Sequence, residues 1–198
     1  MDRISPIHRE VDPDLFSSVI HHIIGQQVSM AAQRTVWQRL QAAAGTLVPE
    51  TVAAMPAEAL QALGMTRRRA LYILEFARKV ASGDFDLDAL AEMGDREVLA
   101  RLTSLRGVGP WTAEMLLIFG LRRPDVVSWG DLAILRGMRM LYRKRSIDQR
   151  TFQRLRKRYS PYGTTASLYL WAIACGALPE LTDPGAGRKP DKKRGRHT

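Results

Sequence analysis

Apolar residues recur at spacings of three and four along most of the chain, which is the period of an amphipathic helix. Alternation of apolar and polar residues with period two, the pattern of a half-buried strand, hardly occurs. The pattern therefore predicts an all-α protein. Helices are expected near residues 13–24, 30–40, 56–64, 67–82, 86–91, 95–103, 110–121, 131–142, 148–159 and 164–177.

Residues that commonly cap helices stand before several of these segments. Asp12 followed by Pro13 is the pair expected at the start of the first helix, and Ser29, Thr66 and Asp95 are expected to cap later ones. The second helix carries the apolar residues Met30, Val36, Trp37 and Leu40, of which Trp37 is expected in the core. On the fourth helix the positions expected to face inward are Leu71, Leu74, Ala77 and Val80.

Size and composition are those of a globular protein with a core of its own. The chain has 198 residues, of which 45% are hydrophobic and 25% charged, and this excludes disordered and collagen-like classes. Cys175 is the only cysteine, which excludes an intramolecular disulfide, a cysteine-rich zinc site and a four-cysteine iron-sulfur cluster. No apolar stretch has the length of a signal peptide or membrane span, so we expect a cytoplasmic or nucleoid-associated protein.

The charge balance points to a polyanionic partner. Thirty Lys and Arg face twenty Asp and Glu, a formal net charge of +10. Nucleic acid is the leading candidate, and an anionic membrane is second. Residues 182–198 are rich in Gly, Pro, Lys and Arg, and we predict a disordered basic tail there. Such a tail either keeps the protein soluble or tethers it to DNA.

The segment from Leu105 to Ala113 has the composition of a phosphate-binding turn. Gly107 and Gly109 flank one apolar residue, and Pro110 opens the next helix. Glycines permit close approach of the backbone, and the free amides at a helix start attract an anion. Thr112 adds a hydroxyl at the same end. The alternative is a tight turn between two helices without a ligand.

Five segments together resemble a known family. They are IIGQQVSMAA, GMTRRRALYI, LRGVGPWTAE, VVSWGDLAILRG and SPYGTTASLYLWAIA. They are similar to the helix-hairpin-helix DNA glycosylases, specifically to the alkylated-base branch of the 3-methyladenine DNA glycosylase II type. The resemblance covers roughly residues 14–177. It implies a two-lobed fold with the active cleft between the lobes. One lobe would comprise residues 14–121 and the other residues 1–13 with 122–181. It also implies duplex DNA with damaged bases as the partner, no cofactor and no membrane, and we expect a monomer.

The resemblance assigns roles to particular residues. Asp131 matches the catalytic aspartate of the family, and its alternative reading is a helix cap alone. Trp111 and Trp171 match aromatic positions near the base pocket. The residues implied to touch DNA are Gln26, Gln27, Gly107, Val108, Gly109 and Thr112. Gln27 would enter the space of the flipped base and Gln26 would meet the opposite strand, unless this amide pair merely satisfies the turn.

Three further candidates rest on weaker grounds. Trp129 is a pocket candidate only because it stands two residues before Asp131, and for each tryptophan the alternative is a place in the core. Arg67, Arg68 and Arg69 open a helix where positive charge opposes the dipole, so a DNA phosphate is a secondary hypothesis. Asp125 is expected to be a solvated turn residue.

The expected reaction depends on the residue at position 111 and on the positive charge of an alkylated purine. Bifunctional members of the family carry a lysine where this chain has Trp111, so we expect hydrolysis without strand cleavage. An N3- or N7-alkylated purine is already cationic and leaves without an acid, so a single carboxylate suffices. The rivals are the same scaffold acting on oxidised, deaminated or mismatched bases, and a non-catalytic DNA-binding module.

Metal binding by side chains is not expected. His21 and His22 are adjacent and therefore point to different helix faces, and no acidic residue stands at ligand spacing. The family resemblance implies at most a monovalent cation on the backbone carbonyls of Thr103, Arg106 and Val108.

Overall fold

The computed structural model describes residues 4–8 and 14–186, and these contain eleven helices and no strand. The predicted all-α class is confirmed. The chain divides into two compact units, one formed by residues 9–123 and the other by residues 1–8 with 124–198. No helix in the described part is long and apolar enough to cross a membrane.

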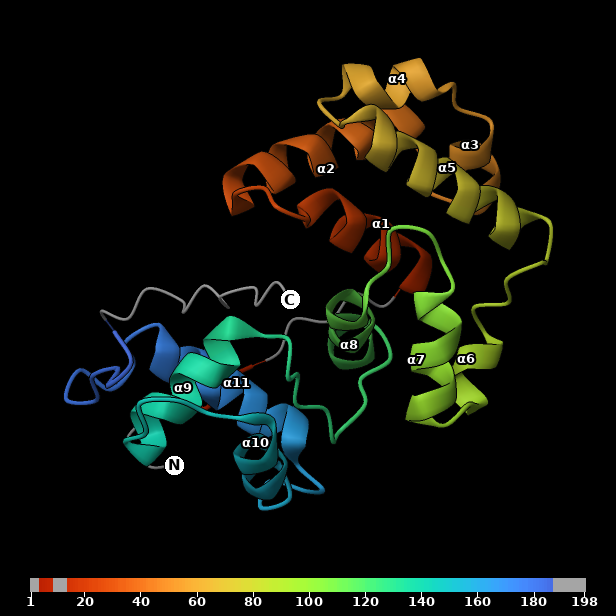
Figure 1. The fold of residues 1–198 in the computed structure, drawn as a ribbon. Helices are drawn as coiled ribbons and strands as arrows, with labels where there is room; N and C mark the ends of the chain where they lie inside the picture. Colours follow the sequence, from red (N-terminus) through yellow and green to blue (C-terminus); the bar gives the residue numbers. More distant parts are fainter. Residues whose placement is uncertain (1–3, 9–13, 187–198) are drawn as a thin grey trace, which may run out of the picture. The chain divides into compact units, whose positions relative to one another are not determined.

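The unit of residues 9–123 contains eight helices. They are α1 (Leu15–Gly25), α2 (Met30–Ala44), α3 (Pro49–Ala53), α4 (Ala57–Ala62), α5 (Arg67–Ala81), α6 (Ala89–Glu92), α7 (Asp95–Thr103) and α8 (Pro110–Phe119). The central helix is α1, which is buried along most of its length and packs against α2, α5 and α8 (Figure 1). Phe16 of α1 stacks on Phe76 of α5 with the ring centroids 5.3 Å apart. Contact with three helices explains why α1 buries residues on more than one face.

The second unit contains α9 (Leu132–Tyr142), α10 (Gln149–Arg156) and α11 (Gly163–Ala174). The axes of α9 and α11 come close because Gly137 lies against the backbone of Leu170, where a Cβ would meet the carbonyl oxygen at 2.3 Å. Phe152 and Leu155 of α10 complete the core beside Ile134, Met138 and Leu170. The three helices lie together in Figure 1, and this packing fixes the start of α9.

Helix caps are partly as predicted. Ser29 caps α2 by accepting a hydrogen bond from Ala32 N, and Thr66 caps α5 by accepting one from Arg69 N. The first helix begins later than expected, because Asp14 is its cap and accepts hydrogen bonds from Phe16 N and Ser17 N. Asp12 and Pro13 lie outside the described residues. Asp95 is the first residue of α7 rather than its cap.

The predicted inward face of α5 is partly right. Leu74 and Ala77 are buried as predicted, together with Ala70, Ile73 and Phe76. Leu71 is 46% exposed and was wrongly expected to face inward, and Met30 at the start of α2 is 80% exposed. Trp37 is half-buried and its ring packs on His21, with the centroids 4.9 Å apart. The pattern had also given no sign of α3.

The ordered chain continues into the segment that was predicted to be disordered. Asp183 accepts hydrogen bonds from Arg139 Nε at 2.9 Å and from Arg139 Nη2 at 2.6 Å, so the chain is fixed on α9 at least to this point. Residues 182–186 of the predicted tail thus belong to the part of the chain that the structure describes. Residues 187–198 of the predicted tail lie outside the described part.

Candidate functional site

The glycine-containing loop joins α7 to α8 and leads directly into a helix start. Val108 N donates to Leu105 O at 3.1 Å, and Ala113 N donates to Gly109 O at 2.9 Å. Pro110 is the first residue of α8 and has no amide hydrogen to leave unsatisfied. The loop therefore presents the free amides of a helix N-terminus, as the predicted phosphate-binding turn requires.

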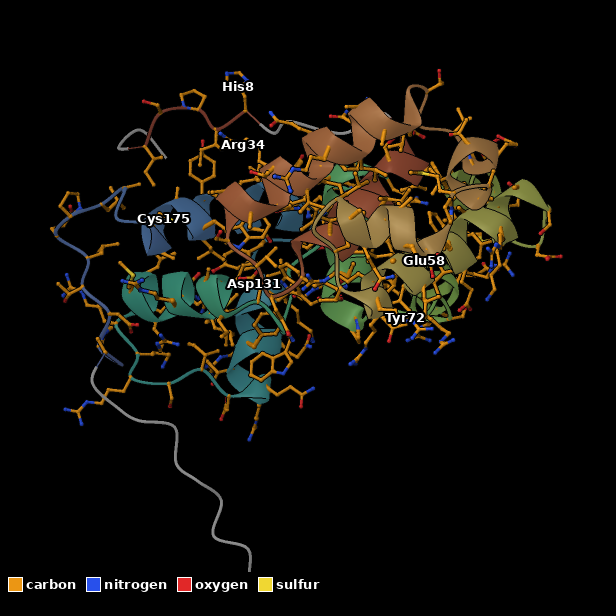
Figure 2. The ribbon with its side chains drawn as sticks, turned by 90° about the horizontal axis from the view of Figure 1, so that it is seen from above. His8, Arg34, Glu58, Tyr72, Asp131 and Cys175 are labelled. Carbon is orange, nitrogen blue, oxygen red and sulfur yellow. The ribbon has the colours of Figure 1, made fainter. Side chains whose placement is uncertain are left out.

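Position 107 requires glycine for two reasons, its backbone conformation and the lack of room for a side chain. Its φ is +87°, in the left-handed region, and a Cβ there would lie 2.3 Å from Cδ2 of Tyr72. Tyr72 of α5, labelled in Figure 2, thus packs directly against the loop. Gly109 differs, because its φ is −87° and a Cβ there would meet nothing within 4 Å.

A cavity of about 940 Å³ opens beside this loop, within the unit of residues 9–123. Three segments far apart in sequence line it: the α1–α2 turn, the start of α5 and the loop with the start of α8. Seven of the site residues that the sequence predicts line this one cavity: Gln26, Gln27, Gly107, Val108, Gly109, Trp111 and Thr112.

The two glutamines of the α1–α2 turn face different surroundings. Gln27 is exposed and has a φ of +55°, so the backbone turns sharply at this residue. Gln26 instead points inward: its Nε2 donates to Gly107 O at 2.6 Å and to Thr112 Oγ1 at 3.4 Å. Its carbonyl oxygen accepts a hydrogen bond from Arg69. The contact of Gln26 with an opposite DNA strand stays a prediction, whereas its internal role was not foreseen.

Two arginines flank Tyr72, one of the residues that line the cavity. Arg68 Nε donates to the Tyr72 hydroxyl at 2.9 Å, and its guanidinium lies 6.0 Å from the ring centroid. The guanidinium of Arg106 lies 5.6 Å from the same centroid and forms an ion pair with Glu75 at 3.3 Å. Two guanidinium groups therefore lie close to the glycine-containing loop, against which Tyr72 packs. Tyr72 and the side chain of Arg106 were not predicted from the sequence, although Tyr72 stands four residues after Arg68, the spacing of one helix face.

The aromatic candidates occupy three different settings. Trp111 is 42% exposed and lines the cavity, so it is not a core residue. Trp129 is 36% exposed and packs edge-on against Phe152, with centroids 5.0 Å apart. Trp171 is partly buried and packs against the core of its unit. Thr112 is almost fully buried and holds Gln26.

Asp131 stands at the start of α9 (Figure 2) and is 7% exposed. Its Oδ1 accepts hydrogen bonds from Ala133 N and Ile134 N, both at 2.9 Å. Asp131 is thus the N-cap of α9, and these bonds fix the orientation of its carboxyl group. A carboxylate held in this way keeps one geometry, which a catalytic group requires.

Asp125 does not behave as a solvated turn residue. Its Oδ2 accepts a hydrogen bond from Ser160 Oγ at 2.7 Å and its Oδ1 accepts one from Gly163 N at 3.1 Å. It therefore ties the segment before α9 to the start of α11, and the sequence prediction was wrong because the partners lie 35 and 38 residues away.

No group of three or more His, Cys, Asp or Glu side chains suited to a metal ion occurs in the described ranges 4–8 and 14–186. The cation predicted on the carbonyls of Thr103, Arg106 and Val108 stays a prediction. The carbonyl of Gly107 in the same loop is already occupied by Gln26.

The family model of the HhH-GPD superfamily base excision DNA repair proteins matches residues 20–161, which include both the loop and Asp131. The chain belongs to this family. It is 30% identical to DNA-3-methyladenine glycosylase 1 of Schizosaccharomyces pombe, over 88% of this chain and 78% of that protein. The predicted family resemblance is therefore confirmed.

Solved structures of this family have the same fold. A crystal structure of a DNA-3-methyladenine glycosidase from Bacillus halodurans matches with a TM-score of 0.80 and 32% identity, over 88% of this chain and 82% of that one. Mag1 of Schizosaccharomyces pombe in complex with abasic DNA matches with a TM-score of 0.75 and 28% identity, over 87% and 86%. The chain spans less of some curated relatives, covering 59% of YfjP of Bacillus subtilis.

Proposed function

We propose that this chain is a monofunctional DNA glycosylase that hydrolyses the N-glycosidic bond of alkylated purines of the 3-methyladenine and 7-methylguanine class. The observation that carries the proposal is Asp131, a nearly buried carboxylate held by two backbone amides, in a chain whose relatives are named DNA-3-methyladenine glycosylases. The product is an abasic site in duplex DNA, processed further by base excision repair. Such an enzyme works as a monomer where the DNA is, in the cytoplasm or nucleoid.

Binding begins at the phosphate backbone. The loop amides between Gly107 and Thr112 hold a phosphate, and Arg68 and Arg106 add positive charge beside it. The damaged nucleotide leaves the stack so that its C1′ becomes accessible, and Gln27 fills the space left in the duplex. An exposed, sharply turned residue is suited to this insertion because no neighbouring contact has to be broken.

Asp131 acts on the sugar rather than on the base. As the bond from C1′ to the base nitrogen breaks, the pair of electrons goes to the cationic ring, which leaves neutral. The positive charge that develops on the sugar is stabilised by the carboxylate. Water then adds to C1′ and gives a proton to the Asp131 carboxylate. Trp111, with Trp171 and Trp129 as further candidates, holds the cationic base by ring-face attraction.

The test is release of free bases from methylated duplex DNA, followed by inspection of the strand. The proposal expects free 3-methyladenine and 7-methylguanine and an intact strand that breaks only after alkali treatment. It also expects no covalent adduct after borohydride reduction, since position 111 holds tryptophan instead of lysine. Release of oxidised or deaminated bases instead, or strand breakage without alkali, would contradict it.

A further inference from the structure

The positive charge of the described chain is unevenly divided between the two units. Residues 9–123, which include the hairpin loop, carry 13 Lys and Arg and 13 Asp and Glu. Residues 124–186 carry 10 Lys and Arg against 5 Asp and Glu. The excess that predicts a nucleic-acid partner thus belongs to the unit without the loop.

Much of this excess lies along the outer face of α10. Arg150, Arg154 and Lys157 stand at spacings of four and three residues, so they share one helix face, and all three are exposed. We call them the α10 cationic row. The opposite side of α10 is buried through Phe152 and Leu155.

The α10 cationic row forms no ion pair within the part of the chain that the structure describes, although Asp148 at the N-cap of α10 attracts Arg150 electrostatically. Among the described residues, ion pairs join Arg136 and Arg139 to Asp183, but none joins a carboxylate to the row. Like charges at this spacing repel one another, which costs helix stability unless a polyanion is bound. Because the apolar side of α10 is buried, the helix has no apolar face to insert into a membrane.

We propose that the α10 cationic row binds the phosphate backbone of duplex DNA as a second contact, independent of the lesion and of the hairpin loop. Cβ atoms four residues apart on a helix lie about 6 Å apart, which suits successive phosphates of one strand. The contact deepens the proposed function, on which it rests, by raising affinity for undamaged duplex during the search for lesions.

The experiment compares two charge-matched variants, Arg150→Gln/Arg154→Gln in the row and Arg78→Gln/Arg96→Gln, which removes exposed arginines from the other unit. Binding to undamaged duplex is measured between about 50 and 300 mM salt, after circular dichroism has shown that both variants fold. The row variant is expected to lower the slope of log K against log salt by about 1.8, because each lost phosphate contact removes about 0.9. The control should keep the wild-type slope.

An unchanged slope in the row variant, or an equal fall in the control, would overturn the proposal. A row variant that loses affinity for anionic vesicles but not for duplex DNA would overturn it too, in favour of a membrane surface. Because binding to undamaged DNA needs no catalysis, the result stands apart from the proposed function. A protein that releases no base can still show the change of slope.

A second inference rests on the contacts of Gln26. Its side chain bonds Gly107 O of the loop, and its backbone carbonyl accepts from Arg69 of α5. The next residue is Gln27, whose left-handed backbone conformation aims the side chain that is expected to enter the duplex. One residue therefore joins the phosphate-binding loop to the insertion turn.

We infer that Gln26 is a positioning residue that couples phosphate binding at the loop to insertion of Gln27. This inference rests on the proposed function. When the loop holds a phosphate, the bond from Gln26 Nε2 to Gly107 O holds the turn at a fixed place relative to that phosphate. Loss of the bond leaves both parts in place but uncoupled.

The test uses Gln26→Ala, with Gln61→Ala as control, because Gln61 bonds only within its own helix, to Ala57 O. Gln26→Ala is expected to slow single-turnover release of a fully paired lesion by about tenfold, the value of one good hydrogen bond. Release of a lesion in an unpaired bulge should be almost unchanged, since that base needs no extrusion. The fluorescence of 2-aminopurine beside an abasic analogue, which reports unstacking without cleavage, should fall in parallel.

A merely structural role predicts a different result. Gln26→Ala would then slow release from paired and bulged substrates equally and lower the melting temperature, and the inference would be wrong. If no substrate is cleaved even by the wild type, the proposed function fails, yet the 2-aminopurine signal still decides whether Gln26 controls insertion.

Discussion

At the residue scale, the site depends on a few positions whose identity is dictated by space. Gly107 is fixed by a positive φ and by the ring of Tyr72, whereas Gly109 two residues later is fixed by neither. From the sequence the two glycines looked equivalent, because the partner that distinguishes them comes from α5, 35 residues earlier. The sequence predicted the loop, but only the packing shows that Gly107 is required by the fold and that Gly109 is accessible to a ligand.

Gly107→Ala and Gly109→Ala should therefore fail in different ways. Gly107→Ala forces either the loop or Tyr72 to move. Overpacking and backbone strain should lower the free energy of unfolding by roughly 1–3 kcal/mol, and the melting temperature should fall by several degrees. Gly109→Ala should keep the wild-type melting temperature and weaken binding to DNA, since its methyl group stands where a phosphate approaches the amides. Thermal melting and binding titrations check both, and equal melting temperatures for the two variants would contradict the assignment.

At the element scale, helix starts were more predictable than helix faces. Ser29, Thr66 and Asp131 each cap a helix as the sequence indicates, because a side-chain oxygen before an apolar run is a local signal. On α5, Leu74 and Ala77 are buried as predicted, but Leu71 was wrongly placed inward because it is as apolar as its buried neighbours. α3 has only five residues, too few for a stripe to show.

The close packing of α9 on α11 should be sensitive to a single methyl group. Gly137→Ala would place Cβ 2.3 Å from Leu170 O, so α9 has to shift, and Asp131 at its start shifts with it. We expect a loss of roughly 1–3 kcal/mol of stability and reduced base release. Gly94→Ala, where a Cβ meets nothing within 4 Å, is the control for both readouts. A Gly137→Ala protein as stable as the control would show that the helices can separate freely.

The pair of Asp183 and Arg139 makes the stability of this unit dependent on pH. The hydrogen bond from Arg139 holds the pKa of the Asp183 carboxyl below its ordinary value. Because the pKa is lower in the folded state, the pair stabilises the fold fully above the ordinary carboxyl value, and this stabilisation is lost as pH falls through the folded-state value. Asp183→Asn should lower the melting temperature at about pH 7 and should lower it less at about pH 3. An equal difference at both values would show that the charge of Asp183 does not matter.

At the scale of the whole molecule, the all-α class and the family could be predicted from the sequence, but the distribution of charge could not. Counting along the sequence could separate only the tail of residues 182–198 from the rest of the chain, and both of these parts are basic. The two units are defined by contacts between distant segments, and only with their bounds known does the unit of residues 9–123 prove balanced in charge. For the same reason the sequence could name Asp131, Trp111 and Gln27 as candidates but gave no sign of Tyr72 or of the role of the Arg106 side chain.

The central claim is that Asp131 is the carboxylate of a glycosylase acting on alkylated purines. The most direct measurement compares wild type with Asp131→Asn for release of free 3-methyladenine and 7-methylguanine from methylated duplex DNA, with a binding titration beside it. Asparagine keeps an oxygen for the amides of Ala133 and Ile134, so the cap and the fold should persist. We expect release to fall by at least about a hundredfold while DNA binding is unchanged. Release by Asp131→Asn at the wild-type rate would contradict the account.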